Sequence, residues 1–202
     1  MTRGWPATLE HDEVRLRPIR GRDAVVWEQV RRRNAAWLGP WDATPPPGGD
    51  ILQHTYPSMA RALRRQARRG TALPFVIEVG GEFAGQVTVN NVVRGSAQFA
   101  SIGYWVAREY AGRGVTPRAV ALTIDHCFGP VGLHRIEISV RPENSNSLRV
   151  VEKLGLREVG LARRYLHIDG EWRDHRVFEV TREDAPEGML ARVLAESHQS
   201  HE

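Results

Sequence analysis

Midway along the chain the apolar residues change from helical spacing to alternation, and this change constrains the fold more than any other feature of the sequence. From Leu73 to Val79 large apolar residues occupy every second position, which is the pattern of a strand. Gly80-Gly81 provides a turn, and the strand pattern returns over residues 83–93 and about 97–106. Three strands joined by short turns predict an antiparallel meander.

The residues before this meander predict one strand and two helices. Apolar residues alternate with arginines over 14–18, as in a strand with one buried face. We expect Asp23 to cap a helix that continues to about Leu38. A second, amphipathic helix is predicted over 52–67, with Gly70 as its stop. Between the helices lies a segment rich in proline and glycine, 44–50, which predicts a surface loop.

After the meander, helical and extended patterns alternate, and this order implies a parallel strand pair. The expected segments are a helix over 115–128, a strand over 135–140 and a helix over 147–154. Two further strands, 156–168 and 171–180, flank Asp169-Gly170, the dipeptide best suited to a hairpin turn with positive φ at both positions. The sequence therefore predicts that the fold ends in an antiparallel hairpin.

The chain of 202 residues predicts a single domain over 1–202, with a core at about 13–180 and a C-terminal tail at 181–202. The tail carries a short apolar pattern near Leu190, and residues 197–202 are expected to fray. With Cys127 as the only cysteine, disulfide frameworks and zinc ribbons are excluded, and no metal is expected. No apolar run approaches the ~20 residues of a membrane helix. The N-terminal residues lack the apolar stretch of a signal peptide and the lone cysteine suits a reducing compartment, so we expect a cytoplasmic protein.

Basic residues only slightly exceed acidic ones, with 28 Lys plus Arg against 24 Asp plus Glu and a formal net charge of +4. This excess permits a polyanionic partner without diagnosing one. Lys153 is the only lysine, which indicates a general bias toward arginine, so arginine counts carry little weight. The densest clusters are Arg31-Arg32-Arg33 and the set Arg61, Arg64, Arg65, Arg68 and Arg69. Each is either a solvated helix face or a patch facing a substrate or the ribosome.

The segment 111–117, between a predicted strand and a predicted helix, carries the clearest chemical signal. Exposed N–H groups and the helix dipole at such a turn can receive an anion, and glycines at Gly112 and Gly114 allow it to approach closely. Neither the lysine of a Walker loop nor the third glycine of a Rossmann fingerprint is present. Taken alone, the segment is equally well a tight strand-to-helix turn.

The order of elements over residues 13–180 resembles the GNAT superfamily of acetyl-CoA-dependent N-acetyltransferases. Ala111 and Thr116 depart from the usual ends of that superfamily's pyrophosphate loop, but Gly114 matches its centre. Residues 102–106 and 165–175 narrow the similarity to ribosomal-protein alanine N-acetyltransferases of the RimJ type. The resemblance implies an α+β, mixed α/β fold. Its central, mostly antiparallel sheet is flanked by helices and has a parallel pair at the coenzyme cleft.

The resemblance also implies site residues. Those expected to bind coenzyme A are Tyr104, Trp105, Val106, Ala111, Gly112, Arg113, Gly114, Val115, Thr116, Asn144 and Ser147. Ser147 is the candidate proton donor to the leaving thiolate, because the tyrosine that many relatives have at position 151 is a valine here. Serving as a helix cap would explain Ser147 equally well.

The general base is less clearly indicated. No carboxylate stands at Leu166, where some relatives carry a glutamate, so Glu137, Asp174 and His175 remain as candidates. Glu137 is equally well a salt-bridge partner on its strand, and we expect Asp174 and His175 to contact the substrate. An α-amine, with an ordinary pKa of ~7.7–8.0, needs little deprotonation at neutral pH.

We therefore expect transfer of acetyl from acetyl-CoA to a protein N-terminal α-amine, such as an alanine on a ribosomal protein, with transient ribosome contact. Two alternatives stay open. One is acetylation of a small-molecule amine or lysine. The other is a basic RNA-binding or ribosome-binding module with a degenerate coenzyme site. A monomer and a homodimer are both compatible with the sequence.

Overall fold

The computed structural model describes residues 3–48 and 55–199, and its framework is one open sheet. The strands are β1 (Leu9–His11), β2 (Val14–Pro18), β3 (Leu73–Val79), β4 (Glu82–Val93), β5 (Phe99–Val106), β6 (Arg135–Val140), β7 (Arg157–Ile168) and β8 (Glu171–Thr181). Their order across the sheet is β1-β2-β3-β4-β5-β6-β8-β7. Only β5 and β6 pair in parallel within the described sheet. The predicted meander and parallel pair are confirmed.

Helices cover both faces of this sheet. They are α1 (Ala24–Arg33), α2 (Ala35–Leu38), α3 (Tyr56–Arg69), α4 (Val115–His126), α5 (Ser145–Lys153) and α6 (Met189–Gln199). Successive residues of β3 face opposite sides: Phe75 packs in the cluster of α4, α5 and α6, whereas Val76 packs with α1 and α3. Burial on both faces explains why β3 is apolar almost throughout.

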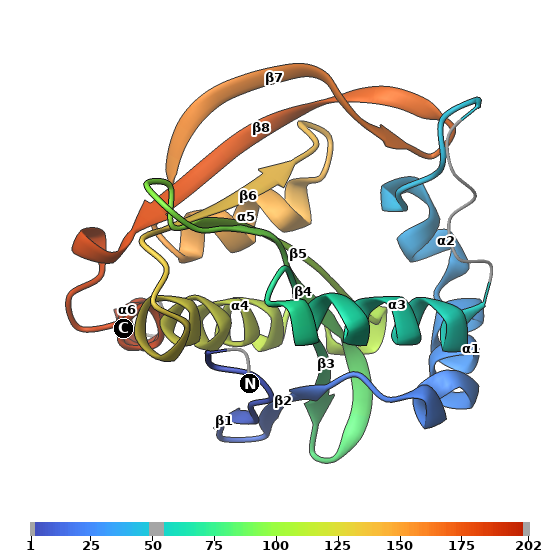
Figure 1. Cartoon of the computed structure of the whole chain (residues 1–202), viewed down its shortest axis with the longest axis horizontal. Helices are drawn as coiled ribbons and strands as arrows, with labels where there is room; N and C mark the ends of the chain where they lie inside the picture. Colours follow the sequence, from blue (N-terminus) through green and yellow to red (C-terminus); the bar gives the residue numbers. More distant parts are fainter. Residues whose placement is uncertain (1–2, 49–54, 200–202) are drawn as a thin grey trace.

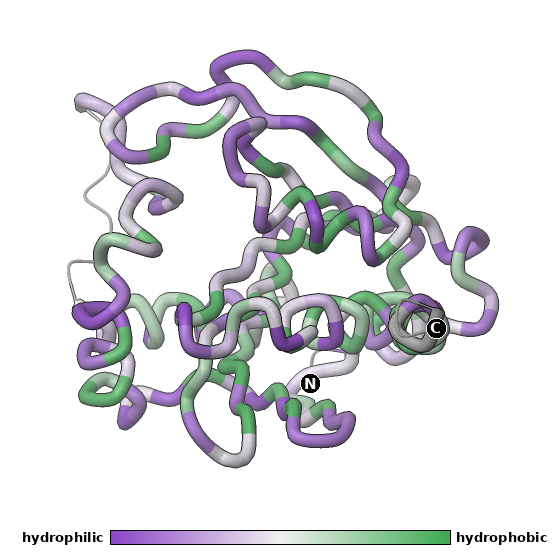
Figure 2. Tube along the Cα trace, turned by 180° about the vertical axis from the view of Figure 1, so that it is seen from behind, coloured by the Kyte–Doolittle hydropathy of each residue, from purple (hydrophilic) through white to green (hydrophobic). Residues whose placement is uncertain are grey.

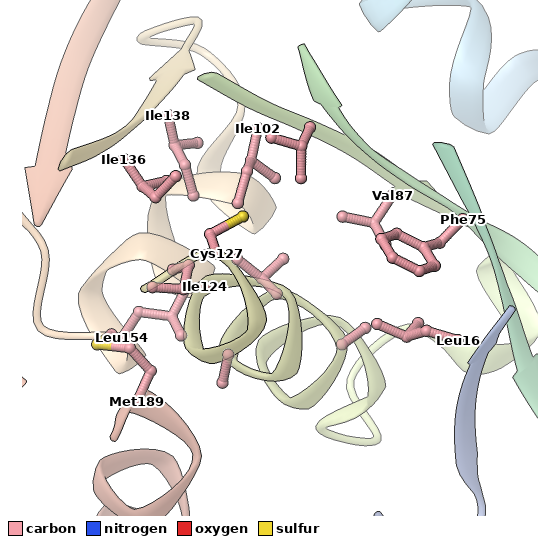
Figure 3. Close-up of a cluster of buried hydrophobic side chains, with 14 of the residues drawn as sticks. Leu16, Phe75, Val87, Ile102, Ile124, Cys127, Ile136, Ile138, Leu154 and Met189 are labelled. Atoms are coloured by element: carbon pink, nitrogen blue, oxygen red, sulfur yellow. The ribbon is translucent and has the colours of Figure 1, made fainter. Parts of the chain in front are cut away.

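The larger apolar cluster gathers around α4 (Figure 3). Ile102, Ile136 and Ile138 descend from β5 and β6 onto this helix, and the Cys127 sulfur lies among them. Burial raises the pKa of the Cys127 thiol to about 12. The thiol therefore stays protonated and packs as a small apolar group.

The first helical segment differs from its prediction. The expected continuous helix to Leu38 is interrupted at Asn34, whose buried side chain donates to Val30 O at 3.0 Å and accepts from Arg108 N at 2.8 Å. Asp23 does not cap α1 with its side chain, because its carboxylate accepts hydrogen bonds from the guanidinium of Arg17. The Asn34 side chain thus links α1 to the segment after β5, and Asp23 is held by Arg17 and by Arg20 N, which donates to it at 2.8 Å.

The termini and the second helix also differ in extent. The short strand β1 had not been predicted. The predicted start of α3 at Leu52 lies outside the described residues, within which the helix begins at Tyr56. Rather than fraying from residue 197, α6 continues to Gln199, and residues 200–202 lie outside the description. Its first turn docks on α4, where Asp125 accepts from Met189 N at 2.6 Å and Leu190 N at 3.0 Å.

The β7–β8 hairpin arches away from the rest of the sheet, and its tip comes down beside the segment after α2 (Figure 1). Asp169 and Gly170 have φ of 50° and 79°, so the predicted turn is confirmed. The tip is tied down by a bridge between Ala43 and Ile168. Seen from behind, the arch is largely hydrophilic with isolated apolar positions (Figure 2). The ring of Trp172, near its tip, is exposed.

Candidate active site

The parallel ladder between β5 and β6 is short, and the site begins where it ends. It joins three residue pairs, Phe99 to Ser101 against Arg135 to Glu137, after which the strands separate. Ala107 N donates to Ala84 O on β4 at 2.8 Å. Because main-chain groups of a strand alternate in direction, the preceding N–H, that of Val106, points toward the gap beside β6.

Gly85 on β4 allows the end of β5 to lie where it does. A Cβ at this position would stand 2.2 Å from Trp105 O and 2.9 Å from Val106 Cα, closer than atoms can approach. Only a glycine fits beneath this part of β5. The close approach draws the end of β5 toward β4.

A cavity of about 450 Å³ opens at this gap. Its lining residues come from the segment after α1, the end of β5, the loop before α4, and α5; they are Trp37, Leu38, Trp41, Asp42, Ala43, Tyr104, Trp105, Val106, Ala111, Gly112, Gly114, Val115, Thr116, Pro117, Asn144, Asn146, Ser147, Arg149, Val150 and Lys153. Most residues predicted to bind coenzyme are therefore brought together around one cavity.

The loop before α4 presents main-chain donors to this cavity. Ala111 N donates to Arg108 O at 3.0 Å, whereas the N–H groups of residues 112–116 donate to no other group among the described residues. Gly112 and Gly114 have φ of 75° and 73°, a conformation that turns successive amides to one side. Together with the start of α4, these amides form a site for an anion.

Two basic side chains that the sequence analysis missed add to this end. Arg149 and Lys153 line the cavity from α5, along with Asn146 and Val150. The four positions follow i, i+3, i+4 and i+7 spacing and so share one face of the helix. That spacing was readable in the sequence and could have identified them.

A matching family model and several relatives give this cavity a context. The model, described as an acetyltransferase (GNAT) domain, matches residues 13–157. The chain belongs to the GNAT acetyltransferase family. Its members are N-acetyltransferases that take the acetyl group from acetyl-CoA, as the resemblance of the sequence implied.

Individual relatives agree with this family. The structure of Mycobacterium smegmatis RimJ in complex with CoA-disulfide is 44% identical, with a TM-score of 0.90, and the match covers 98% of each chain. The [ribosomal protein uS5]-alanine N-acetyltransferase of Escherichia coli is 30% identical over 87% of this chain and 91% of its own. The probable N-acetyltransferase YjcK of Bacillus subtilis is 40% identical over 50% of this chain, and the match spans about half of that relative, 55%.

Two residues that line the acetyltransferase cavity, Tyr104 and Ser147, lie near one another. The Tyr104 hydroxyl is buried and has no hydrogen-bond partner among the described residues. Burial raises the pKa of Tyr104 far above its usual value, and the nearby Ser147 side chain acts in the other direction. The helix cap of α5 is Asn144, which accepts from Ser147 N at 3.0 Å, so the Ser147 hydroxyl does not have to cap.

The predicted general base lies elsewhere. Glu137 is on β6 where that strand is still paired with β5, and its carboxylate accepts from Arg135 Nε at 2.9 Å. It does not line the acetyltransferase cavity. Glu137 therefore has the salt-bridge partner on its own strand that the second interpretation of this residue expected.

The two predicted substrate contacts are also occupied within the hairpin. Asp174 accepts from Arg164 N at 2.7 Å and so holds the bulge of β7. His175 is buried, its Nδ1 lies 3.0 Å from Arg173 O, and burial lowers its pKa. Neither Asp174 nor His175 lines the cavity.

Arg113, predicted to bind coenzyme, turns its side chain outward. Its guanidinium pairs with Glu13 at 3.3 Å and lies over the ring of Tyr110, 5.5 Å from the centroid. Its main-chain N–H remains part of the loop. Any contribution of Arg113 to anion binding therefore comes from its backbone.

The end of the cavity away from the loop is built by residues that sequence reasoning missed. Trp37 donates its indole N–H to Val106 O at 3.1 Å, and the ring of Trp41 lies 5.2 Å from the guanidinium of Arg141. Asp42 adds a carboxylate beside these rings. The motif Trp37 to Asp42 precedes the proline-rich loop, but nothing in its spacing indicated that it would face the strand gap.

Proposed function

We propose that this acetyltransferase transfers acetyl from acetyl-CoA to the α-amine of a protein N-terminus, an alanine of a ribosomal protein in particular. The observation that carries the proposal is the single cavity that connects the unpaired loop amides of residues 112–116 with the aromatic and acidic end at Trp41 and Asp42. Similarity to relatives named for ribosomal-protein acetylation supports this choice of acceptor.

The residues present suit coenzyme A. Loop amides can donate to its diphosphate, and Arg149 and Lys153 can pair with its phosphate groups. The Tyr104 hydroxyl, buried and unpartnered in the described chain, gains a hydrogen-bond acceptor when a ligand lies beside β5. When bound, acetyl-CoA supplies the acetyl group as a thioester.

The chain contributes orientation and hydrogen bonds to the transfer. Val106 N–H can donate to the carbonyl oxygen as negative charge develops there. The amine nitrogen forms the new bond to the acetyl carbon, the carbon–sulfur bond breaks, and the thiolate gains a proton as the amine loses one. Ser147, with Tyr104 beside it, is the proposed donor to the sulfur, whereas the amine proton passes to water.

Three further expectations belong to this proposal. The protein acts in the cytoplasm, where ribosomal proteins are made, and as a monomer or homodimer. Brief contact with the ribosome would use α3, which exposes Arg61, Arg64, Arg65, Arg68 and Arg69 and contains no acidic residue. Among the described residues, no helix has the length and apolar character needed to span a membrane.

Calorimetric titration with acetyl-CoA, followed by turnover assays, tests the function. A peptide with a free N-terminal alanine is compared with the same peptide blocked at its N-terminus and carrying one lysine. We expect coenzyme binding and acetylation of the free α-amine only. Failure to bind acetyl-CoA contradicts the enzyme itself, and preferential turnover of the blocked lysine peptide contradicts the acceptor.

A further inference from the structure

Arg31 on α1 lies beside the end of the cavity that Trp41 and Asp42 line, where the proposed function places the acceptor amine. Its guanidinium carbon is 5.7 Å from the ring centroid of Trp27 and 5.3 Å from that of Trp105. Gln86 accepts from both indole N–H groups, at 3.0 and 3.1 Å, and so fixes the two rings that hold the guanidinium. Such a stack keeps a cation at one position.

The guanidinium forms an ion pair with Asp42, which lines the cavity. The Arg31 side chain is 21% exposed and that of Asp42 is 40% exposed, so solvent screens the pair only in part. The other charged residues of the lining are Arg149 and Lys153, both basic. Within the described lining, the cavity therefore offers no carboxylate that is not already neutralised.

From this arrangement we propose that the Arg31–Asp42 pair sets acceptor selectivity: it admits the single amine of a polypeptide N-terminus and discriminates against polyamines. This inference rests on the proposed function and deepens it. Asp42 can accept a hydrogen bond from an incoming amine, while Arg31 cancels the charge that would attract several ammonium groups. An acceptor with one amine loses little, because that amine must be neutral to react.

The size of the effect follows from the charge of the acceptor. Spermidine carries several positive charges along a flexible chain, and when one amine reaches the strand gap, a neighbouring ammonium group can come within a few ångströms of Arg31. Repulsion between partly screened unit charges at such distances corresponds to about a tenfold change in an equilibrium or rate constant. A peptide N-terminus without nearby basic residues experiences little of it.

The test measures kcat/KM for spermidine relative to kcat/KM for the alanine peptide in full-length variants. In Arg31→Gln the ratio should rise about tenfold, because the charge is removed. Arg31→Lys keeps the charge and should keep the ratio of the unaltered protein. Arg32→Gln, an exposed neighbour on the same helix, serves as the control for a change in net charge alone.

Asp42→Asn should change the ratio in the opposite direction, because it leaves Arg31 unopposed. If Arg31→Gln does not fold, Asp42→Asn alone is sufficient to test the inference. The inference is overturned if the unaltered protein uses spermidine as well as the peptide, if Arg31→Gln leaves the ratio unchanged, or if Asp42→Asn raises it. Equal behaviour of Arg31→Lys and Arg31→Gln also overturns it, because packing would then be responsible.

Calorimetric titration with spermidine separates this inference from the proposed function. Tighter spermidine binding by Arg31→Gln than by Arg32→Gln is expected whether or not the peptide is turned over. A chain that fails to acetylate the alanine peptide yet shows this difference contradicts only the proposed acceptor. Equal spermidine affinities in a chain that acetylates the peptide contradict only the selectivity role.

Discussion

Tyr104 combines a buried hydroxyl with the absence of a hydrogen-bond partner among the described residues. Ser147 is near enough to influence its pKa, but without the geometry of a hydrogen bond. Since burial raises the pKa of Tyr104, the phenol stays protonated and acts as a hydrogen-bond donor, not as a proton source. The thiolate would then be stabilised by Tyr104 and protonated through Ser147 or water.

Replacing Tyr104 by Phe should lower kcat about tenfold, the value of a hydrogen bond to a charged group. Thermal stability should be unchanged or slightly higher, since an unsatisfied buried hydroxyl is removed. Steady-state kinetics and a thermal melt check both expectations. Tyr165→Phe, on an exposed ring outside the cavity, is the matched control. A fully active Tyr104→Phe variant would remove the hydroxyl from the mechanism.

Ser147→Ala should slow turnover without abolishing it, because a thiol with an ordinary pKa near 8.5 leaves readily. The helix should persist, since the cap is the side chain of Asn144. Circular dichroism tests the helix, and the kcat of acetyl transfer tests the role. Turnover equal to that of the unaltered protein argues against Ser147 as proton donor.

Gly114→Asp tests the anion site at the start of α4. A carboxylate among the loop amides would compete with the coenzyme diphosphate and repel it, so affinity for acetyl-CoA should fall at least about tenfold. Gly95→Asp is the control, because Gly95 has a similar φ of 70°, against 73° at Gly114, and lies outside the cavity lining. Calorimetric titration compares the two variants. Equal affinities would show that the loop does not hold the diphosphate.

Among the elements, the end of β5 owes its position to Gly85 on the neighbouring strand β4. The contact between Gly85 and Trp105 O leaves no room for a methyl group, so Gly85→Ala must displace the end of β5. We expect a loss of about 1–3 kcal/mol in the free energy of unfolding, together with weaker acetyl-CoA binding. Urea denaturation and calorimetry measure the two effects.

Gly103→Ala provides the comparison on the same pair of strands. There the nearest atom to an added Cβ is Asn90 Nδ2 at 3.7 Å, an ordinary contact. Stability and coenzyme affinity should therefore remain close to those of the unaltered protein. Similar losses in both variants would mean that glycine is needed for reasons other than the close approach.

Elements whose pattern depends on local forces were predictable. Alternation identified β3, and the Asp169-Gly170 turn identified the β7–β8 hairpin, since the backbone conformation of that dipeptide is a local property. The break at Asn34 was not predictable, because its cause is a hydrogen bond to Arg108, far away in the sequence. Local signals cannot reveal a partner that only the folded chain brings near.

The residues of the site likewise divide into those that the sequence indicated and those that only the packing of distant elements brings to the cavity. The loop at 111–116 was found because its glycine spacing is visible in the sequence, whereas the residues at the end of β5 were expected from the resemblance to the acetyltransferases. Asp42 and Trp41 were missed, since their place at the cavity results from packing between distant elements. Glu137 had been assigned to the correct strand, but whether it faces a substrate or Arg135 depends on tertiary contacts.

For the molecule as a whole, two buried histidines predict a loss of stability in mild acid. Burial lowers the pKa of His126 and of His175, so both remain neutral in the folded state below the pH at which they bind protons in the unfolded chain. The unfolded state then binds more protons, and stability declines as pH falls below about 6.5. Urea denaturation at several pH values between 7 and 5 measures this slope.

His126→Gln should make the slope shallower, because it removes one of the two groups. Its Nε2 lies 2.7 Å from Gly4 O, and the glutamine amide can replace a donor at that position. An unchanged slope would assign the acid sensitivity to other groups.

The three-pair contact between β5 and β6 has a consequence for what can enter the sheet. Beyond these three pairs, main-chain N–H and C=O groups of β5 face the cavity, whereas those of an ordinary edge strand face bulk water. A slender, unbranched molecule with amide bonds of its own, such as pantetheine, can pair with these groups in the place of a strand.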